Sequence, residues 1–151
     1  TVPFFSYHKA PYAFPVDSRK WTIIKPFTLS DALTPPTVDV WYNPGTPTII
    51  LPIGSWNVMY RAGTRIVAAG ATYGLETTLS SANNSESDSE MTAGCGISAP
   101  AGGAGVWFTA QKFIVVASKT TYYLNIRTTT ATPTSIAWNN KQLIGATLAY
   151  L

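Results

Sequence analysis

QKFIVVASKTTYYLNIRT, residues 111–128, contains two strongly strand-like runs separated by a short turn-forming segment. Pairing Ala117 with Tyr122 leaves a loop between them, and the antiparallel register then places Phe113 opposite Ile126. This register predicts a hairpin with a core face made of Phe113, Val115, Ala117, Tyr122, Leu124 and Ile126. The opposite face carries Ile114, Val116 and Tyr123, and it is more apolar than the solvated side of an ordinary antiparallel sheet. We therefore expect a second cover over this opposite face.

The C-terminal run KQLIGATLAYL, residues 141–151, has the same property. One side of the predicted strand carries Ile144, Ala146, Leu148 and Tyr150. The other side carries Leu143 and Leu151, which flank the smaller residues Gly145, Thr147 and Ala149. A terminal strand with two apolar faces is normally central in its sheet and covered by another chain. We therefore predict an obligate oligomer with an interface that includes Ile114, Val116, Tyr123 and Leu148.

The remaining chain predicts short strands and almost no helix. The runs WTIIKPFTL, VDVWY and TIILP are rich in β-branched and aromatic residues and are separated by turn-forming clusters. In GSWNVMYRA, apolar residues alternate with more polar ones, and no apolar set with helical spacing persists anywhere. Roughly eight to ten strands at this spacing are typical of sandwiches and barrels. We predict an all-β jelly-roll sandwich.

The N-terminal part differs from the rest in pattern. The first residues, TVPFFSYHKAPYAFPVDSRK, mix prolines with aromatic residues and predict an extended arm. We expect residues 1–44 to form this arm and the first strands, packed on a knob of residues 45–151. The chain begins without Met and has no signal-peptide pattern or long apolar run, which we interpret as a mature or excised soluble fragment.

Composition argues against several classes of protein. Charged residues make up 11% of the chain, while Thr, Ser, Ala and Gly are abundant, as is typical of extracellular, fibrous or virion proteins. The net charge is +3, but the basic residues are scattered apart from Arg19-Lys20, so we expect no nucleic-acid partner. The single Cys95 excludes an intrachain disulfide, and we interpret it as a buried or idle thiol rather than a nucleophile.

Catalytic and metal-binding patterns are weak. His8 is the only histidine, and no G-x-S-x-G segment exists, which argues against a Ser-His-Asp triad and a zinc site. No pattern pairs the seven carboxylates as glycosidase chemistry requires. Glu86, Asp88 and Glu90 could give oxygens to calcium, but the EF-hand spacing is missing and a solvated acidic loop is the simpler interpretation. We expect no enzyme, cofactor or metal.

Three tryptophans lie beside predicted loops. Trp41 precedes NPG, Trp107 follows GGAG and Trp138 precedes NNK. An exposed indole at such a position can stack on a sugar, whereas buried aromatic residues are the commoner case in a sandwich. We therefore treat all three as candidate surface contacts.

Three arginines lie on or beside predicted strands. Arg61, Arg65 and Arg127 each need fixed acceptors or an edge position, and Glu76 is the only obvious carboxylate in these strands. In an oligomer, such an arginine could face a carboxylate of the next chain or a small bound carboxylate anion. Alternatively, all three extend to solvent along their aliphatic stems.

The segment LPIGSWNVMYRA, residues 51–62, resembles the Leu-Pro-x-Gly-x-Trp/Tyr-x-Val strand of the jelly rolls of the tumour necrosis factor (TNF) and C1q type. The match consists of Leu51, Pro52, Gly54, Trp56 and Val58. The segments TYGLETTLSSANNSESD and KFIVVASKTTYYLNIRTTT, followed by a terminal strand, are similar to the trimeric knobs of bacteriophage tail fibres and tail needles. Short-tailed phages of enteric bacteria are the nearest likeness, and the resemblance covers about residues 45–151.

This resemblance implies a homotrimeric, non-enzymatic knob at the tip of a phage tail. Such a knob belongs to the virion, outside the cell, next to other tail proteins. It would contact a host cell-surface component, or penetrate the envelope, during attachment and genome delivery. The alternative is a secreted carbohydrate-binding β-sandwich module.

Overall fold

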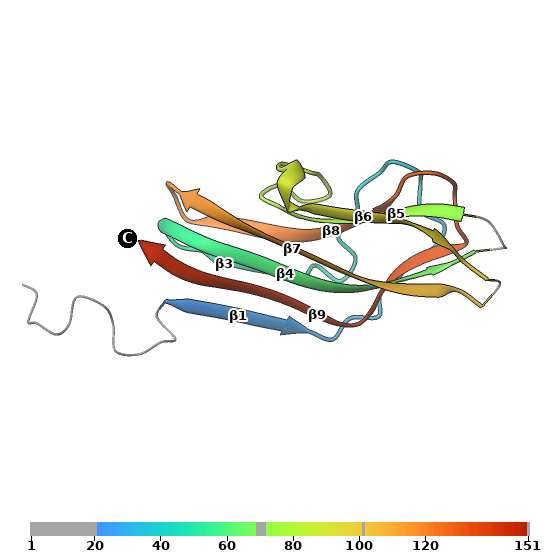
Figure 1. Ribbon diagram of the computed structural model, residues 1–151, viewed down its shortest axis with the longest axis horizontal. Coiled ribbons are helices and arrows are strands. Elements are labelled where there is room, and N and C mark those ends of the chain that lie inside the picture. The colour runs from blue at the N-terminus through green and yellow to red at the C-terminus, as the bar shows by residue number, and fades with distance from the viewer. Residues whose placement is uncertain (1–20, 69–71, 101, 151) are drawn as a thin grey trace, which may run out of the picture.

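The computed structural model describes residues 21–68, 72–100 and 102–150, so the expected arm of residues 1–20 lies outside the described residues. Two antiparallel sheets pack as a sandwich, which confirms the all-β, jelly-roll-like prediction (Figure 1). Sheet A has the order β1 (Thr22–Phe27), β9 (Ser135–Tyr150), β4 (Gly54–Val67), β7 (Ala104–Val116), with β2 (Ala32–Leu33) also paired to β9. Sheet B has the order β3 (Thr48–Leu51), β8 (Thr120–Thr128), β5 (Thr72–Ser80), β6 (Thr92–Ser98).

The core lies between the two sheets, and β4 shows how the sequence builds it. Trp56, Val58 and Tyr60 are buried, while the residues between them are not, as strand alternation predicts. The Tyr60 hydroxyl donates to the carbonyl oxygen of Thr77 on β5 over 2.9 Å, so the buried phenol links sheet A to sheet B. Burial raises the pKa of Tyr60 to about 12, against a smaller lowering by its hydrogen bond to Thr77.

The predicted hairpin of residues 111–128 is wrong, because β7 and β8 belong to different sheets. On β7, Ile114 pairs with Trp56 of β4, whereas on β8, Leu124 pairs with Leu79 of β5. The short turn after β7 therefore carries the chain from sheet A to sheet B. A turn of this length suits a hairpin and a sheet-to-sheet connection equally well.

The predicted inner and outer faces of β7 are consequently exchanged. Val115 is 72% exposed and Phe113 is also exposed, although both were assigned to the core. Val116 is only 4% exposed, and Ile114 packs against the core. In a hairpin, the pairing register determines which residues of one strand share a face with given residues of the other. Because β7 and β8 lie in different sheets, this relation does not hold between them. The assignment was correct on β8, where Leu124 and Ile126 are fully buried.

The C-terminal strand β9 is central in sheet A, between β1 and β4. Its inner face carries Ile144 and Ala146, which are buried, and Leu148, which packs against the core. Residues 21–44, the described part of the expected arm, include β1 and β2, and both pair with β9. Among the described residues, no helix has the length and apolar character that a membrane crossing requires.

Candidate functional site

Sheet A presents an uncharged outer face near the C-terminal end of β9. In one cross-strand row, Met59 lies between Gln111 and Gly145, and Gly145 also pairs with Ile24. We call this surface the apolar face; it consists of Thr22, Ile24, Asn57, Met59, Gln111, Phe113, Val115, Gly145 and Thr147. Its four large apolar side chains, Ile24, Met59, Phe113 and Val115, are all exposed.

Two polar side chains of the apolar face, Gln111 and Asn57, bond to each other without charge. The side-chain amide of Gln111 donates to Oδ1 of Asn57 over 2.9 Å. Between these strands and β1, the missing side chain of Gly145 leaves a shallow hollow of about 130 Å³. The solvated face of an antiparallel sheet is usually polar, whereas the centre of a protein interface is depleted of charged residues. The apolar face therefore has the character of an assembly surface.

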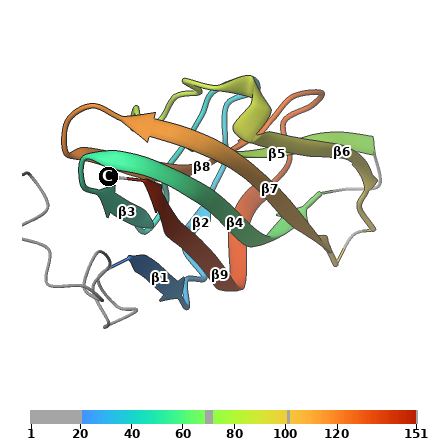
Figure 2. The same cartoon turned by 60° about the vertical axis from the view of Figure 1, so that its left-hand side comes forward.

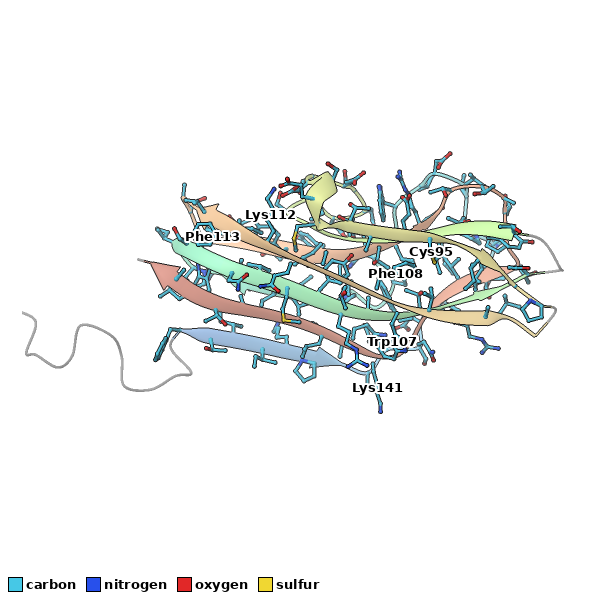
Figure 3. The ribbon with its side chains drawn as sticks, viewed as in Figure 1. Cys95, Trp107, Phe108, Lys112, Phe113 and Lys141 are labelled. Atoms are coloured by element: carbon cyan, nitrogen blue, oxygen red, sulfur yellow. The ribbon has the colours of Figure 1, made fainter. Side chains whose placement is uncertain are left out.

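A pocket of about 300 Å³ borders the apolar face, where the next cross-strand row joins Pro26, Leu143 and Arg61. We call it the Trp107 pocket; it is lined by Pro26, Phe27, Thr28, Arg61, Trp107, Lys141, Gln142 and Leu143. Figure 3 shows Trp107 and Lys141 close together, with Phe113 toward the other end of β7.

Gly63 explains the position of the Trp107 ring. The two residues are cross-strand partners, and a Cβ atom at Gly63 would lie 2.8 Å from Cζ3 and Cη2 of Trp107. The ring therefore rests on bare backbone, which only glycine provides. On the other side of β4, three residues of β9, numbers 139–141, stand opposite Gly63 alone. This bulge brings Lys141 to the pocket.

The positive charge of the pocket comes from Arg61 and Lys141. The guanidinium carbon of Arg61 lies over the Trp107 ring, 4.4 Å from its centroid. Trp107 remains 43% exposed. Within the described ranges, neither Arg61 nor Lys141 has a carboxylate within ion-pair distance. The structure thus brings together Arg61 and Trp107, which the sequence named separately, and adds Lys141, which it did not name.

Arg127 and Trp41 meet on the outer side of sheet B. Nε of Arg127 lies 2.7 Å from Oε2 of Glu76, and the guanidinium carbon is 4.4 Å from the centroid of the Trp41 ring. These two contacts leave Arg127 with an intrachain partner, and Trp41 is only 7% exposed. Beside them lies an open groove of about 530 Å³ lined mainly by hydroxyl groups and glycines. The prediction of a surface contact at Trp41 is wrong, because Arg127 covers its ring.

The other expected site residues lie apart from the Trp107 pocket. Trp138 is 1% exposed and its indole N–H donates to the carbonyl oxygen of Pro44 over 2.8 Å, so its prediction as a surface contact is also wrong. Arg65 is exposed and donates to the carbonyl oxygen of Gly102 over 3.0 Å.

The four residues expected at a trimer interface are also dispersed. Ile114, Val116 and Leu148 point into the sandwich. For Ile114 and Val116 the cause is the exchange of faces on β7, and Leu148 lies on the inner face of β9. Tyr123 is partly buried on β8, between β3 and β5.

The acidic loop before β6 is held by a basic residue. Nζ of Lys112 on β7 lies 2.6 Å from Asp88 and 2.5 Å from Glu90. These acidic residues belong to the loop around the short 3-10 helix η3 (Ser89–Met91), whose ribbon lies beside β7 in Figure 2. Hydrogen bonding to Asp88, and then to Glu90, raises the pKa of Lys112. The described part of the chain contains no group of three or more side chains that could hold a metal ion.

Comparison with solved structures found a similar fold in two structures of one virus. A structure of infectious bursal disease virus, Gx strain, is similar over 85% of this chain and 33% of that chain, with 13% identity and a TM-score of 0.52. The crystal structure of the infectious bursal disease virus VP2 subviral particle is similar over 84% of this chain and 33% of that chain, with 10% identity and a TM-score of 0.50. The chain thus spans about a third of those chains, and the likeness concerns the fold alone. No family model and no curated protein matches the sequence.

Proposed function

We propose that this chain is a non-enzymatic structural domain of a virion and that it assembles with copies of itself through the apolar face. The apolar face is the single observation that carries the proposal. Four large apolar side chains lie on the outer side of a sheet, and the other residues of the apolar face are uncharged. The similarity of the fold to two virus structures supports the choice of a virion protein.

The physical argument is the free energy of exposed apolar surface. Burial of such surface contributes roughly 25 cal/mol per Å², and an uncharged face brings no ions that must be desolvated without a partner. Copies of the same chain are the proposed occupant, because oligomers of identical subunits are the commonest way to bury a self-complementary apolar patch. The proposed interface therefore does not contain Ile114, Val116 and Leu148, which face the core. It consists of the exposed side chains of Ile24, Met59, Phe113 and Val115.

Within this role, we propose a TNF-like homotrimer that forms the knob of a phage tail needle or tail fibre. The support for this finer assignment is the resemblance of residues 45–151 to such knobs. In that setting, the partners are other tail proteins and a host cell-surface component. We further propose that residues 1–44, the expected arm and first strands, pack on the knob; the pairing of β1 and β2 with β9 supports this for residues 21–44.

A secreted carbohydrate-binding module remains the second candidate, and the exposed Trp107 ring beside two cations favours it. The mass of the chain in solution separates the two candidates. An assembly of several 16.2 kDa chains supports the virion domain, whereas a monomer at all concentrations supports the binding module.

A further inference from the structure

We propose that the Trp107 pocket binds a sugar ring that carries a carboxylate. The proposal goes beyond assembly and rests on the pocket alone. Two features of the pocket must be explained together. Its two cations have no carboxylate within ion-pair distance among the described residues, and its walls are largely apolar. A ligand that pairs only with the cations leaves the apolar walls in contact with water, and a ligand that covers only the walls leaves the cations without an anion.

The cations fit a carboxylate in geometry as well as in charge. The guanidinium carbon of Arg61 lies over the Trp107 ring and the residue is exposed, so its N–H groups can reach a ligand in the pocket. A carboxylate can accept two of these N–H groups side by side. Lys141 comes from the β9 bulge on the neighbouring strand and adds a second positive charge at the same pocket.

The walls fit the ring of a sugar. Trp107 is 43% exposed, and Phe27 and Leu143 also line the pocket, whose volume of about 300 Å³ is at the lower end of small-molecule sites. The C–H groups on one side of a pyranose can pack against aromatic and aliphatic side chains. Inorganic phosphate would leave these walls uncovered, and a wholly apolar ligand would leave Arg61 and Lys141 without an anion.

The pocket is held in shape by a buried side chain. Gln142 is buried and donates from Nε2 to the carbonyl oxygen of Gly63 over 3.3 Å. Its Oε1 accepts from the backbone N–H of Leu29, also over 3.3 Å. These bonds join β9 to β4 and to the segment that follows β1, and each of these three parts contributes residues to the pocket lining. A pocket held in this way loses little conformational entropy on binding.

The test compares two ligands that differ only in the carboxylate, methyl β-D-glucuronide and methyl β-D-glucoside. Tryptophan fluorescence of the full chain is titrated with each ligand at constant ionic strength. We expect the glucuronide to bind roughly tenfold more tightly than the glucoside. An excess of inorganic phosphate should not displace it. The methyl glycoside of N-acetylneuraminic acid, in a parallel titration, distinguishes a nine-carbon acidic sugar from a hexuronic acid.

Two variants locate the site. Arg61→Gln should lower the affinity for glucuronide to that for glucoside, whereas Arg65→Gln, an exposed residue of the same strand outside the pocket, should leave it unchanged. The proposal is overturned by equal binding of both glycosides, by absence of saturable binding, by displacement with phosphate, or by an equal loss in both variants. If Arg61→Gln does not fold, the comparison of glucuronide and glucoside binding to the wild type still tests the proposal.

Discussion

Val115 and Val116 are neighbours in the sequence, yet Val115 is 72% exposed on the apolar face while Val116 is 4% exposed in the core. The pair marks the boundary between two surfaces with different roles. Val116 contributes to the stability of the single chain through burial between the sheets. Val115 can contribute only if something covers the outer side of sheet A, and we propose that another copy of the chain does so.

Unfolding of the wild type should depend on protein concentration. If copies of the chain cover the apolar face, dilution shifts the equilibrium toward the unfolded chain and lowers Tm by several degrees. Differential scanning calorimetry over a wide range of concentrations measures this shift. A Tm that stays constant on dilution, with reversible unfolding, would speak against an assembly that stabilises the fold.

Gly63→Ala should destabilise the protein by about 1–3 kcal/mol, because the new methyl group would collide with the Trp107 ring and approach a backbone oxygen. Urea unfolding gives the free energy. Gly96→Ala is the matched control on β6, where the nearest atom to the new methyl group is 3.9 Å away. The double variant Gly63→Ala, Trp107→Ala should recover part of the loss. Equal effects at both glycines would show that the ring does not rest on Gly63.

The raised pKa of Tyr60 leads us to expect a loss of stability at alkaline pH. Its pKa is raised by burial from 10.0 to about 12, so the neutral phenol stabilises the fold fully below pH 10, and this stabilisation is lost as the pH rises toward 12. The expected loss is roughly 3 kcal/mol. The free energy of unfolding is measured for the wild type and for Tyr60→Phe from pH 9 to 12. The difference between the two proteins isolates the contribution of Tyr60 ionisation. Parallel curves for the two proteins would refute the prediction.

Tyr60→Phe should also cost about 1–2 kcal/mol at neutral pH, since Thr77 loses the phenol as a hydrogen-bond partner. The same urea titrations provide this value. A variant as stable as the wild type would mean that the bond between the sheets contributes nothing measurable.

Strand alternation made the fold class predictable. Along β4, the apolar residues Trp56, Val58 and Tyr60 are buried as expected, because one side of the strand is apolar and the other is not. On β7, both sides are apolar at the end of the strand, so alternation could not show which side faces the core. The incorrect hairpin register then assigned the wrong side of β7 to the core. The side that faces the core depends on which distant strands pair with β7, and a local sequence pattern does not show this pairing.

The candidate site was predictable only in pieces. The sequence singled out Trp107 for its loop-side position and Arg61 for its unpaired charge, and each interpretation was made without the other. Their contact depends on the pairing of β4 with β7, and the presence of Lys141 depends on a bulge in β9. The polar run NNK after Trp138 was the one local signal of that bulge.

The most direct test of assembly through the apolar face is the mass of three proteins by sedimentation equilibrium: wild type, Val115→Asp and Ile50→Asp. Ile50 is exposed on sheet B, so its variant controls for the introduced charge. We predict an assembly for the wild type, near three times 16.2 kDa for the proposed trimer, the same mass for Ile50→Asp, and a folded 16.2 kDa monomer for Val115→Asp. A monomeric wild type, or a Val115→Asp variant that keeps the mass of the wild type, would contradict the account.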